Sequence, residues 1–303
     1  DALSGTVTPV VDPPGFEGVL RPYQQRGVGW LAFLGRLGLG ACLADDMGLG
    51  KTAQLIATVL ADPAPGPTLV IAPVSVLGNW QREIERFAPG LSVLVHHGGD
   101  RHDHESHFVE RAAATDVVLT TYSLVARDAD HLGAVSWGRL ALDEAQHIKN
   151  PRTNAAKATA ALVASRRIAL TGTPVENRLA ELWSLMNVLN PGLLGTITGF
   201  TKRFAGPIER DGDEETTALL RRITGPFVLR RLKSDRSIID DLPDKIERPQ
   251  LCTLCLLYTS EAADDLLCVA IGGRRIIQKK NKKTQVTTYT ATMLLNHTYC
   301  HLR

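Results

Sequence analysis

The sequence of 303 residues contains few cysteines and no long apolar run. Four of its five cysteines lie in the last 52 residues, so the main body, which keeps only Cys42, has no disulfide framework. Runs such as TLVIAPVSVL are far shorter than the roughly 20 residues that a membrane-spanning helix requires. The N-terminal segment also lacks the basic start and apolar stretch of a secretion signal. These absences predict a cytoplasmic protein with no membrane partner.

The chain also lacks a strong charge of either sign, since its net charge is +2. This charge is unevenly distributed, because residues 252–303 hold seven Lys and Arg against three Asp and Glu. The remaining body is therefore slightly acidic. The overall charge gives no argument for nucleic-acid binding, and any surface that binds DNA must be a local one.

The composition changes abruptly near residue 252. Up to that point the chain has 21 Arg and 6 Lys, which favours a bacterial source, whereas the rest has 3 Arg and 4 Lys with frequent Cys, Tyr and Thr. Residues 254–303 form either a solvated tail or a stretch that is not native to the protein, and we favour the second explanation. The pair Cys252 and Cys255 is weak evidence for zinc, because no second pair at ligand spacing follows.

The body alternates short apolar runs with amphipathic stretches, which is typical of an α/β fold with a parallel sheet. The intervening segments have helical spacing, as in NWQREIERF, where Trp80, Ile84 and Phe87 share one face. We therefore expect a sheet covered by helices on both sides, in three layers (α/β/α), with a helical appendage over residues 190–235. The expected strands are 41–45, 68–72, 92–96, 116–120, 139–143 and 167–171.

The stretch LADDMGLGKT, residues 43–52, nearly matches a phosphate-binding loop, since it follows an apolar run and opens an amphipathic helix. Gly48 and Gly50 can take a positive φ, which leaves room for phosphate oxygens. Lys51 would reach the β and γ phosphates, and the Thr52 hydroxyl would bind magnesium. The stricter pattern has glycine at the position of Asp45, so the alternative is a glycine-rich turn with an incidental lysine. The candidate nucleotide-binding residues of the loop are Asp45, Asp46, Met47, Gly48, Leu49, Gly50, Lys51, Thr52 and Ala53.

Two adjacent carboxylates follow another predicted strand, in RLALDEAQHIKN. Asp143 would hold magnesium, directly or through water, and Glu144 would orient and polarise an attacking water. The candidate catalytic residues are therefore Lys51, Asp143 and Glu144, and the candidate metal ligands are Thr52 and Asp143. An isolated Asp-Glu is usually a solvated turn. Because the same chain carries a phosphate loop, we favour a site for ATP and Mg²⁺.

These motifs resemble those of the Swi/Snf-type ATPases in helicase superfamily 2, which is DEAD/DEAH-like. DDMGLGKT, LDEAQHIKN and LTGTPVENRLAELWSLMNVLNP are similar to motifs I, II and III. LRPYQQRGVGWL, VIAPVSVLGNWQREIERF and VLTTYS resemble the adenine-reading segment, motif Ia and motif Ib, and VLRRLKSD with LPDKIE resembles the exit from the first domain. The resemblance implies an N-terminal RecA-like P-loop NTPase lobe over residues 18–253, between a linker at 1–17 and the tail at 254–303.

The resemblance also implies an ATPase that moves along double-stranded DNA without necessarily separating the strands, with DNA-bound proteins as further candidate partners. It makes Asp45 the normal variant of the loop in this family. Gln24 would read the adenine edge, although the alternative is a surface glutamine. Thr171 and Thr173 would link the nucleotide state to the DNA-gripping surface, although strand-end capping is the alternative. The residues placed near a DNA phosphate backbone would be Pro73, Ser75 and Thr121.

Two other groups carry less weight. HHGGDRHDHESH favours a solvated loop over a metal site, because no second group of ligands lies nearby in the sequence. Arg230, Arg231 and Lys233 either face DNA or solvate a helix end, and the sequence favours neither. The histidines of the first group are His96, His97, His102, His104 and His107.

In this superfamily ATP is held between two RecA-like lobes, and the second lobe supplies arginines that stabilise the transferring phosphate. The resemblance ends where that lobe should begin. Since an arginine finger contributes about 10³ to 10⁵ to the rate of nucleotide hydrolases, we expect this chain alone to bind ATP weakly and hydrolyse it poorly. Two alternatives stay open, a nucleotide- or DNA-binding module without turnover and a superfamily 2 motor that acts on RNA.

Overall fold

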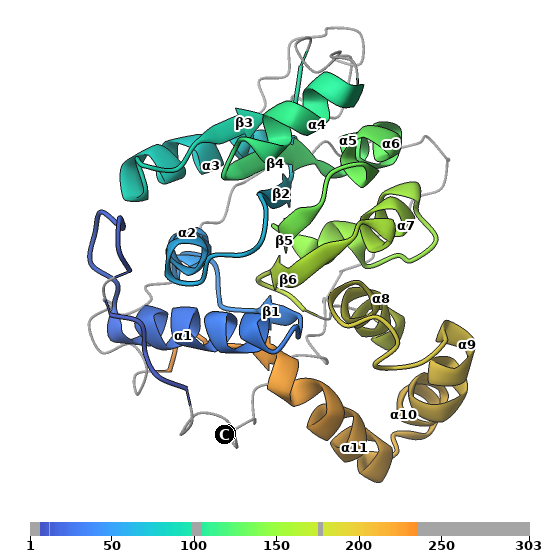
Figure 1. Cartoon of the computed structure of the whole chain (residues 1–303). Coiled ribbons are helices and arrows are strands. Elements are labelled where there is room, and N and C mark those ends of the chain that lie inside the picture. Colours follow the sequence, from blue (N-terminus) through green and yellow to red (C-terminus); the bar gives the residue numbers. More distant parts are fainter. Residues whose placement is uncertain (1–6, 12, 99–104, 175–177, 236–303) are drawn as a thin grey trace, which may run out of the picture. The chain divides into compact units, whose positions relative to one another are not determined.

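The structure is a computed structural model of the chain, and it describes residues 7–11, 13–98, 105–174 and 178–235 (Figure 1). All of these belong to one compact unit. The predictions for residues 1–6 of the linker and for the tail at 254–303 lie outside the described residues and stay predictions. No helix of the described residues is both long enough and apolar enough to cross a membrane.

The centre of the described unit is a seven-stranded sheet in which every strand pair is parallel. The order of the strands is β3-β4-β2-β5-β6-β1-β7. The six expected strands are confirmed to within three residues at each end, and β7 was not expected. The strands are β1 (Ala41–Leu43), β2 (Thr68–Ala72), β3 (Val93–Val95), β4 (Val117–Thr121), β5 (Trp137–Leu142), β6 (Ala164–Leu170) and β7 (Val228–Leu229).

Helices cover both faces of the sheet, which confirms the predicted three-layer α/β/α fold (Figure 1). One face packs against the first three helices, α1 (Pro22–Arg36), α2 (Lys51–Ala61) and α3 (Val74–Phe87). The other face packs against α4 (Glu105–Ala113), α5 (Tyr122–Arg127), α6 (Ala129–Gly133), η2 (Ala145–Ile148), α7 (Asn154–Ala161) and α8 (Leu179–Leu189).

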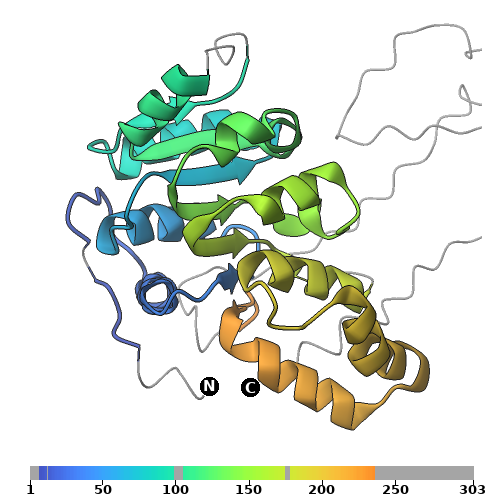
Figure 2. The same cartoon turned by 45° about the vertical axis from the view of Figure 1, so that its right-hand side comes forward.

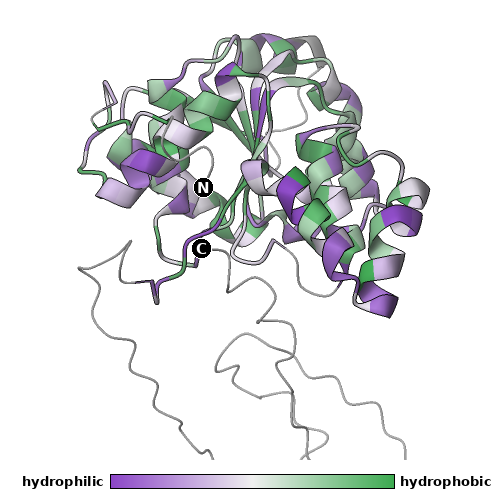
Figure 3. Ribbon diagram, turned by 90° about the horizontal axis from the view of Figure 1, so that it is seen from below, coloured by the Kyte–Doolittle hydropathy of each residue, from purple (hydrophilic) through white to green (hydrophobic). Residues whose placement is uncertain are grey.

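The residues of β1, β2, β4 and β5 are buried on both faces, which explains the largely apolar sequence of these strands. In β2 the side chains of Leu69 and Ile71 enter one core and those of Val70 and Ala72 enter the other. Apolar residues gather along the central strands, whereas the outer faces of the helices are more hydrophilic (Figure 3). Cys42 of β1 is fully buried, and burial raises the pKa of its thiol to about 12.

Beyond α8 the chain forms short helices and then returns to the sheet (Figure 2). Phe200, Phe204 and Leu220 of this segment pack against the core beneath α8. The chain then runs alongside β1, where the Ala44 amide donates to the Leu229 carbonyl at 2.7 Å. The final strand, β7, has only two residues and precedes charged residues, so its apolar pattern is too short to predict a strand. The elements are α9 (Ile197–Phe200), the π-helix η3 (Thr201–Ala205), α10 (Gly206–Asp211), α11 (Glu214–Thr224), the 3₁₀-helix η4 (Gly225–Phe227) and β7.

The parallel arrangement places the carboxyl ends of all strands at one edge of the sheet. The segments that follow β1, β5 and β6 carry the phosphate loop, the acidic pair and Thr171. In the sheet order these three strands are consecutive, with β6 between the other two. Residues far apart in the sequence therefore meet at this edge.

Asn190, at the end of α8, fixes this helix to the start of β1. Its amide accepts from the Gly40 N–H at 2.8 Å and donates to the Gly40 carbonyl at 3.0 Å. Because Asn190→Ala leaves both buried backbone groups unpaired, we expect it to lower the free energy of unfolding by about 1–3 kcal/mol, measured by urea denaturation. Asn79→Ala, which removes an exposed bond to Glu83, should cost about 0.5 kcal/mol or less. Equal losses in the two variants would contradict this role of Asn190.

Candidate active site

The glycine loop lies between β1 and α2 and has the predicted backbone conformation. Gly48 and Gly50 have φ angles of 81° and 72°, in the left-handed region that favours glycine. Within the described part of the chain, no side chain caps the start of α2 at Gly50. The first backbone N–H groups of the helix are thus available to an anion, and the helix dipole favours one there.

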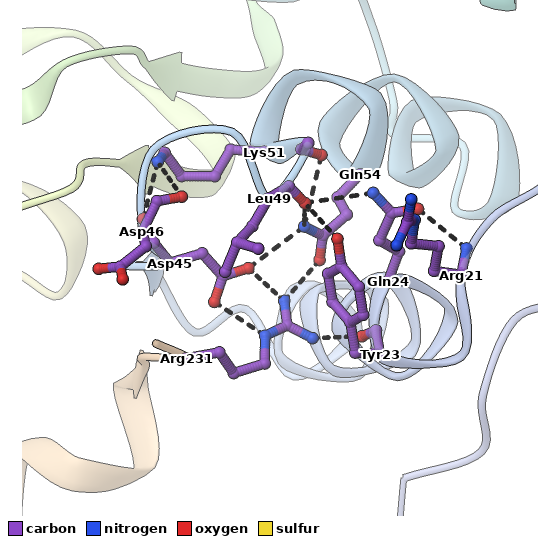
Figure 4. Close-up of polar contacts among 10 residues, drawn as sticks. Arg21, Tyr23, Gln24, Asp45, Asp46, Leu49, Lys51, Gln54 and Arg231 are labelled. Carbon is purple, nitrogen blue, oxygen red and sulfur yellow. Dashed lines mark hydrogen bonds and ion pairs between the residues drawn. The ribbon is translucent and has the colours of Figure 1, made fainter. Parts of the chain in front are cut away.

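Lys51 begins α2, and its side chain turns back over the loop (Figure 4). The ammonium donates to the carbonyl oxygens of Asp45 at 2.7 Å and Asp46 at 3.3 Å. Burial lowers the pKa of Lys51, while the nearby carboxylates of Asp45, Glu144 and Asp143 oppose that shift. The amine is therefore partly desolvated and lies within electrostatic range of the acidic pair.

Asp143 directly follows β5 and is held by three donors. Its Oδ1 accepts from the Glu144 amide at 2.9 Å and its Oδ2 accepts from the indole N–H of Trp80 at 2.7 Å. The Tyr122 hydroxyl donates to its carbonyl oxygen at 2.6 Å. Burial raises the pKa of Asp143, and the hydrogen bond from Trp80 opposes that increase. The carboxylate therefore has a fixed orientation, which a metal ligand requires.

Trp80 is one of two site residues that the sequence did not reveal. Its spacing in α3 predicted only a buried side chain, and it is buried. The contact with Asp143 joins positions 63 residues apart. It arises because α3 follows β2, which pairs with β5 in the sheet. Only the strand order, which the sequence left open, could have indicated it.

Glu144 is the only described residue other than glycine with a positive φ, which is 47°. A non-glycine residue in this region is strained, and such strain is concentrated at functional sites. Its carboxylate accepts from the Gln146 amide at 2.8 Å, and the Thr171 hydroxyl donates to that amide's oxygen at 3.2 Å. The Thr173 N–H in turn donates to the Thr171 hydroxyl at 3.1 Å. Hydrogen bonds thus connect the acidic pair to the segment after β6, and Gln146 is the second site residue that the sequence did not reveal.

Gln24, from the first turn of α1, lies against the glycine loop. Its amide donates to the Leu49 carbonyl at 3.2 Å and accepts from the Arg21 amide at 2.9 Å. A Cβ atom at Gly50 would overlap with the Gln24 amide, so this approach requires glycine. The structure therefore brings Gln24 to the loop, and its role toward adenine stays a prediction.

Asp45 is fully buried, and its carboxylate pairs with the Arg231 guanidinium (Figure 4). Arg231 is only 5% exposed, so both sequence interpretations of this residue, contact with DNA and solvation of a helix end, are wrong. Any contact of Asp45 with nucleotide would have to come from its backbone. The Asp46 carboxylate accepts from the Lys233 amide at 3.0 Å. Met47 is exposed, while Thr52 and Ala53 are half-buried in the first turn of α2.

The residues predicted to lie near DNA follow two neighbouring strands. Pro73 precedes α3 and Ser75 is exposed on its first turn, after β2. Thr121 ends β4 opposite Ala72, and its hydroxyl accepts from the Leu124 amide at the start of α5. These positions share one edge of the sheet, and their contact with DNA stays a prediction.

The histidine-rich stretch divides into separate environments. His96 is 2% exposed, and its Nε2 lies 2.9 Å from the Asp128 carboxylate, so the prediction of a solvated loop is wrong for this residue. His97 and His107 are exposed, whereas His102 and His104 lie outside the described residues. Among the residues that the structure describes, no group of three or more His, Cys, Asp or Glu could hold a metal ion.

Comparisons with known proteins agree with this geometry. The model of the SNF2-related domain matches residues 23–301. YwqA of Bacillus subtilis, named as a candidate ATP-dependent helicase/translocase, is 49% identical over 245 residues, which are 80% of this chain and 26% of that protein. The human chromatin-remodeling ATPase INO80 is 35% identical over 310 residues, which cover 95% of this chain and 19% of that protein.

A solved structure shares the fold. The SWI2/SNF2 ATPase core of Sulfolobus solfataricus in complex with dsDNA matches with a TM-score of 0.71 and 45% sequence identity. The match covers 80% of this chain and 50% of that one. The chain therefore spans about half the length of the solved core and about a quarter or less of these two curated relatives.

Trp80→Phe should raise the pKa of Asp143 further, because it removes a hydrogen bond that stabilises the carboxylate form while keeping most of the packing. The carboxyl group would then take up its proton at a higher pH than in the unchanged chain, as a carbon-detected NMR titration would show. Trp183→Phe removes an indole bond to the Gly195 carbonyl instead and should leave this titration unchanged. Identical titration of Asp143 in the Trp80 variant and the unchanged chain would exclude the bond.

Proposed function

The chain belongs to the SNF2-related family, and from this premise we propose that it is the ATP-binding lobe of a motor that hydrolyses ATP while moving along double-stranded DNA. The observation that carries the proposal is the convergence of the glycine loop and the acidic pair at one edge of the sheet. Lys51 lies within electrostatic range of both Asp143 and Glu144, although 92 and 93 positions separate them in the sequence.

In this proposal the loop amides and Lys51 bind the phosphates, and Gln24 contacts the adenine. The Thr52 hydroxyl and the Asp143 carboxylate are hard oxygen donors of the kind that Mg²⁺ prefers, with phosphate oxygens completing the set. The bonds from Trp80 and the Glu144 amide already orient that carboxylate. A magnesium ion held there would neutralise charge on the phosphates.

Glu144 would accept a proton from the attacking water and orient it toward the terminal phosphate. Its carboxylate is bonded to Gln146, which is bonded to Thr171. A change in the position of Glu144 would therefore move the segment that begins at Thr171 and includes Thr173. These bonds support the proposed link between nucleotide state and DNA grip.

Double-stranded DNA is the proposed partner because the solved relative, at 45% identity, is in complex with it. Pro73, Ser75 and Thr121 are the proposed contacts, since they lie together at the edge of the sheet that carries the nucleotide site. The chain covers half of that solved core, so we propose that a second RecA-like lobe is needed for efficient turnover. A relative named TATA-binding protein-associated factor, Mot1 of yeast, supports DNA-bound proteins as further partners. A cytoplasmic location is proposed from the similarity to the Bacillus protein.

Lys51→Ala should weaken the binding of magnesium-ATP by at least about tenfold, because a charged hydrogen-bond donor to the phosphates is lost. Isothermal titration calorimetry on the unchanged chain and the variant measures this. Lys157→Ala, at an exposed position of α7, is the matched control and should bind as the unchanged chain does. Unchanged affinity in the Lys51 variant would refute the assignment of the loop.

Duplex DNA should stimulate phosphate release by a longer protein that carries this lobe and the second lobe, and much less by this chain alone. Glu144→Gln should keep ATP binding and lower the stimulated rate by about 10²-fold or more, because the general base is lost. Glu85→Gln, at an exposed position of α3, serves as the control.

Measuring phosphate release while duplex RNA is added distinguishes the DNA motor from the alternative of a motor that acts on RNA. Equal or stronger stimulation by RNA would identify an RNA motor. Failure of both duplex DNA and duplex RNA to stimulate either protein would leave only a nucleotide- or DNA-binding module without turnover.

A further inference from the structure

Arg231 lies in the segment after β7 and contacts three residues that are at least 177 positions away from it in the sequence (Figure 4). Its guanidinium contacts the carboxylate of Asp45, the backbone carbonyl of Tyr23 and the amide oxygen of Gln54. These residues belong to the start of the phosphate loop, the first turn of α1 and the second turn of α2. All three guanidinium nitrogens make hydrogen bonds, and the group also lies 5.1 Å from the centre of the Tyr23 ring.

The pair with Asp45 has a geometry that only arginine supplies. Nε donates to Oδ1 at 2.8 Å and Nη2 donates to Oδ2, so two parallel bonds join the groups. A planar guanidinium matches a carboxylate in this way, whereas the ammonium of lysine is a point charge. Both side chains are buried, and losing one partner would leave a buried charge unpaired.

Gln54 extends this pair to the phosphate loop. Its oxygen accepts from Arg231 Nη2 at 2.7 Å, which fixes the direction of its NH₂ group. That group donates to the Asp45 carboxylate at 3.2 Å and lies 3.3 Å and 3.4 Å from the carbonyl oxygens of Leu49 and Gly50. These two carbonyls directly precede Lys51. Hydrogen bonds through Gln54 thus connect Arg231 to the residues at which the loop enters α2.

Backbone groups of the segment after β7 also form hydrogen bonds with the start of the phosphate loop. The Asp46 amide donates to the Arg231 carbonyl at 3.0 Å, and the Lys233 amide donates to the Asp46 carboxylate at 3.0 Å. Together with the bond between Ala44 and Leu229, these contacts align residues 229–233 with the end of β1 and the start of the loop.

Helix α1 approaches this cluster closely. A Cβ atom at Gly27 would overlap with the Gln54 amide oxygen and lie 2.9 Å from Arg231 Nη2. The arginine is thus enclosed by α1, α2 and the loop. Its side chain is buried, and it reaches the phosphate loop through its bonds to Asp45 and Gln54.

We infer that Arg231 is a positioning residue for the phosphate loop, which couples the placement of the segment after β7 to nucleotide affinity. The paired arginine holds Asp45 and Gln54 so that the loop keeps the form that accepts phosphates. Movement of residues 229–233 away from β1 would break the pair and release the loop. Asp45 replaces the glycine of stricter loops because this coupling requires a carboxylate there. The inference rests on the proposed function in that the affected ligand is magnesium-ATP.

The test compares Arg231→Lys and Asp45→Asn with the unchanged chain. Each variant should bind magnesium-ATP about tenfold more weakly or worse, because charge-assisted bonds to the pair are lost. The double variant should lose little more than either single variant, since the two side chains act through one contact. Arg222→Lys, the same substitution at an exposed position of α11, is the control and should bind normally.

A second readout separates positioning from general destabilisation. In the nucleotide-free chain, the ¹H–¹⁵N resonances of Gly48 and Gly50 should shift in both single variants, while Gly66, at the opposite edge of the sheet, should not. If Arg231→Lys does not fold, Asp45→Asn, which keeps the side-chain shape, carries the test alone.

The outcomes distinguish this inference from the proposed function. If the unchanged chain binds no magnesium-ATP, the proposed function fails, and the glycine resonances still decide whether Arg231 sets the loop. If the unchanged chain binds and Lys51→Ala does not, normal binding and unshifted glycines in the Arg231 and Asp45 variants would overturn the inference. Additive losses in the double variant would overturn it as well.

Discussion

The parallel sheet is buried between two layers of helices, so its strands must be apolar on both faces and its polar groups must gather where the strands end. This constraint brings the loop after β1, the acidic pair after β5 and Thr171 after β6 to one edge of the sheet. The same constraint places charged groups in a partly dry environment. Burial lowers the pKa of Lys51 and raises that of Asp143, and each charge is stabilised by oriented neighbours rather than by bulk water.

Much of the fold and part of the site could be predicted from local sequence. The apolar runs of β2, β4 and β5 are continuous enough to identify buried strands, and Gly48 with Gly50 gave the loop conformation because positive φ favours glycine. The contacts that orient the site could not be predicted in this way. The bond between Arg231 and Asp45 spans 186 positions, and neither residue has a local pattern that indicates its partner. A run of basic residues in a sequence is typical of a solvated surface. Only the fold shows that Arg231 is buried.

Two kinds of feature orient the groups of the site. Some involve residues that are close together in the sequence, and others join residues that are far apart. Short-range features, such as the uncapped start of α2 and the strained backbone of Glu144, set the directions of the groups that would meet phosphate and water. Long-range features, such as the bond from Trp80 to Asp143, hold those groups against movement. In this α/β fold, the residues of a short motif are therefore held in place by side chains from other helices and strands.

Cys42 shows what this packing does to chemical reactivity. Its thiol lies in β1, one position before the last residue of the strand, is fully buried, and has a pKa of about 12. The thiolate is the reactive form of cysteine. Because Cys42 is buried and protonated in the folded chain, it does not react with oxidants or alkylating reagents. This sulfur becomes modifiable only when the sheet opens around β1, which lies between β6 and the edge strand β7, so modification of Cys42 would report that opening.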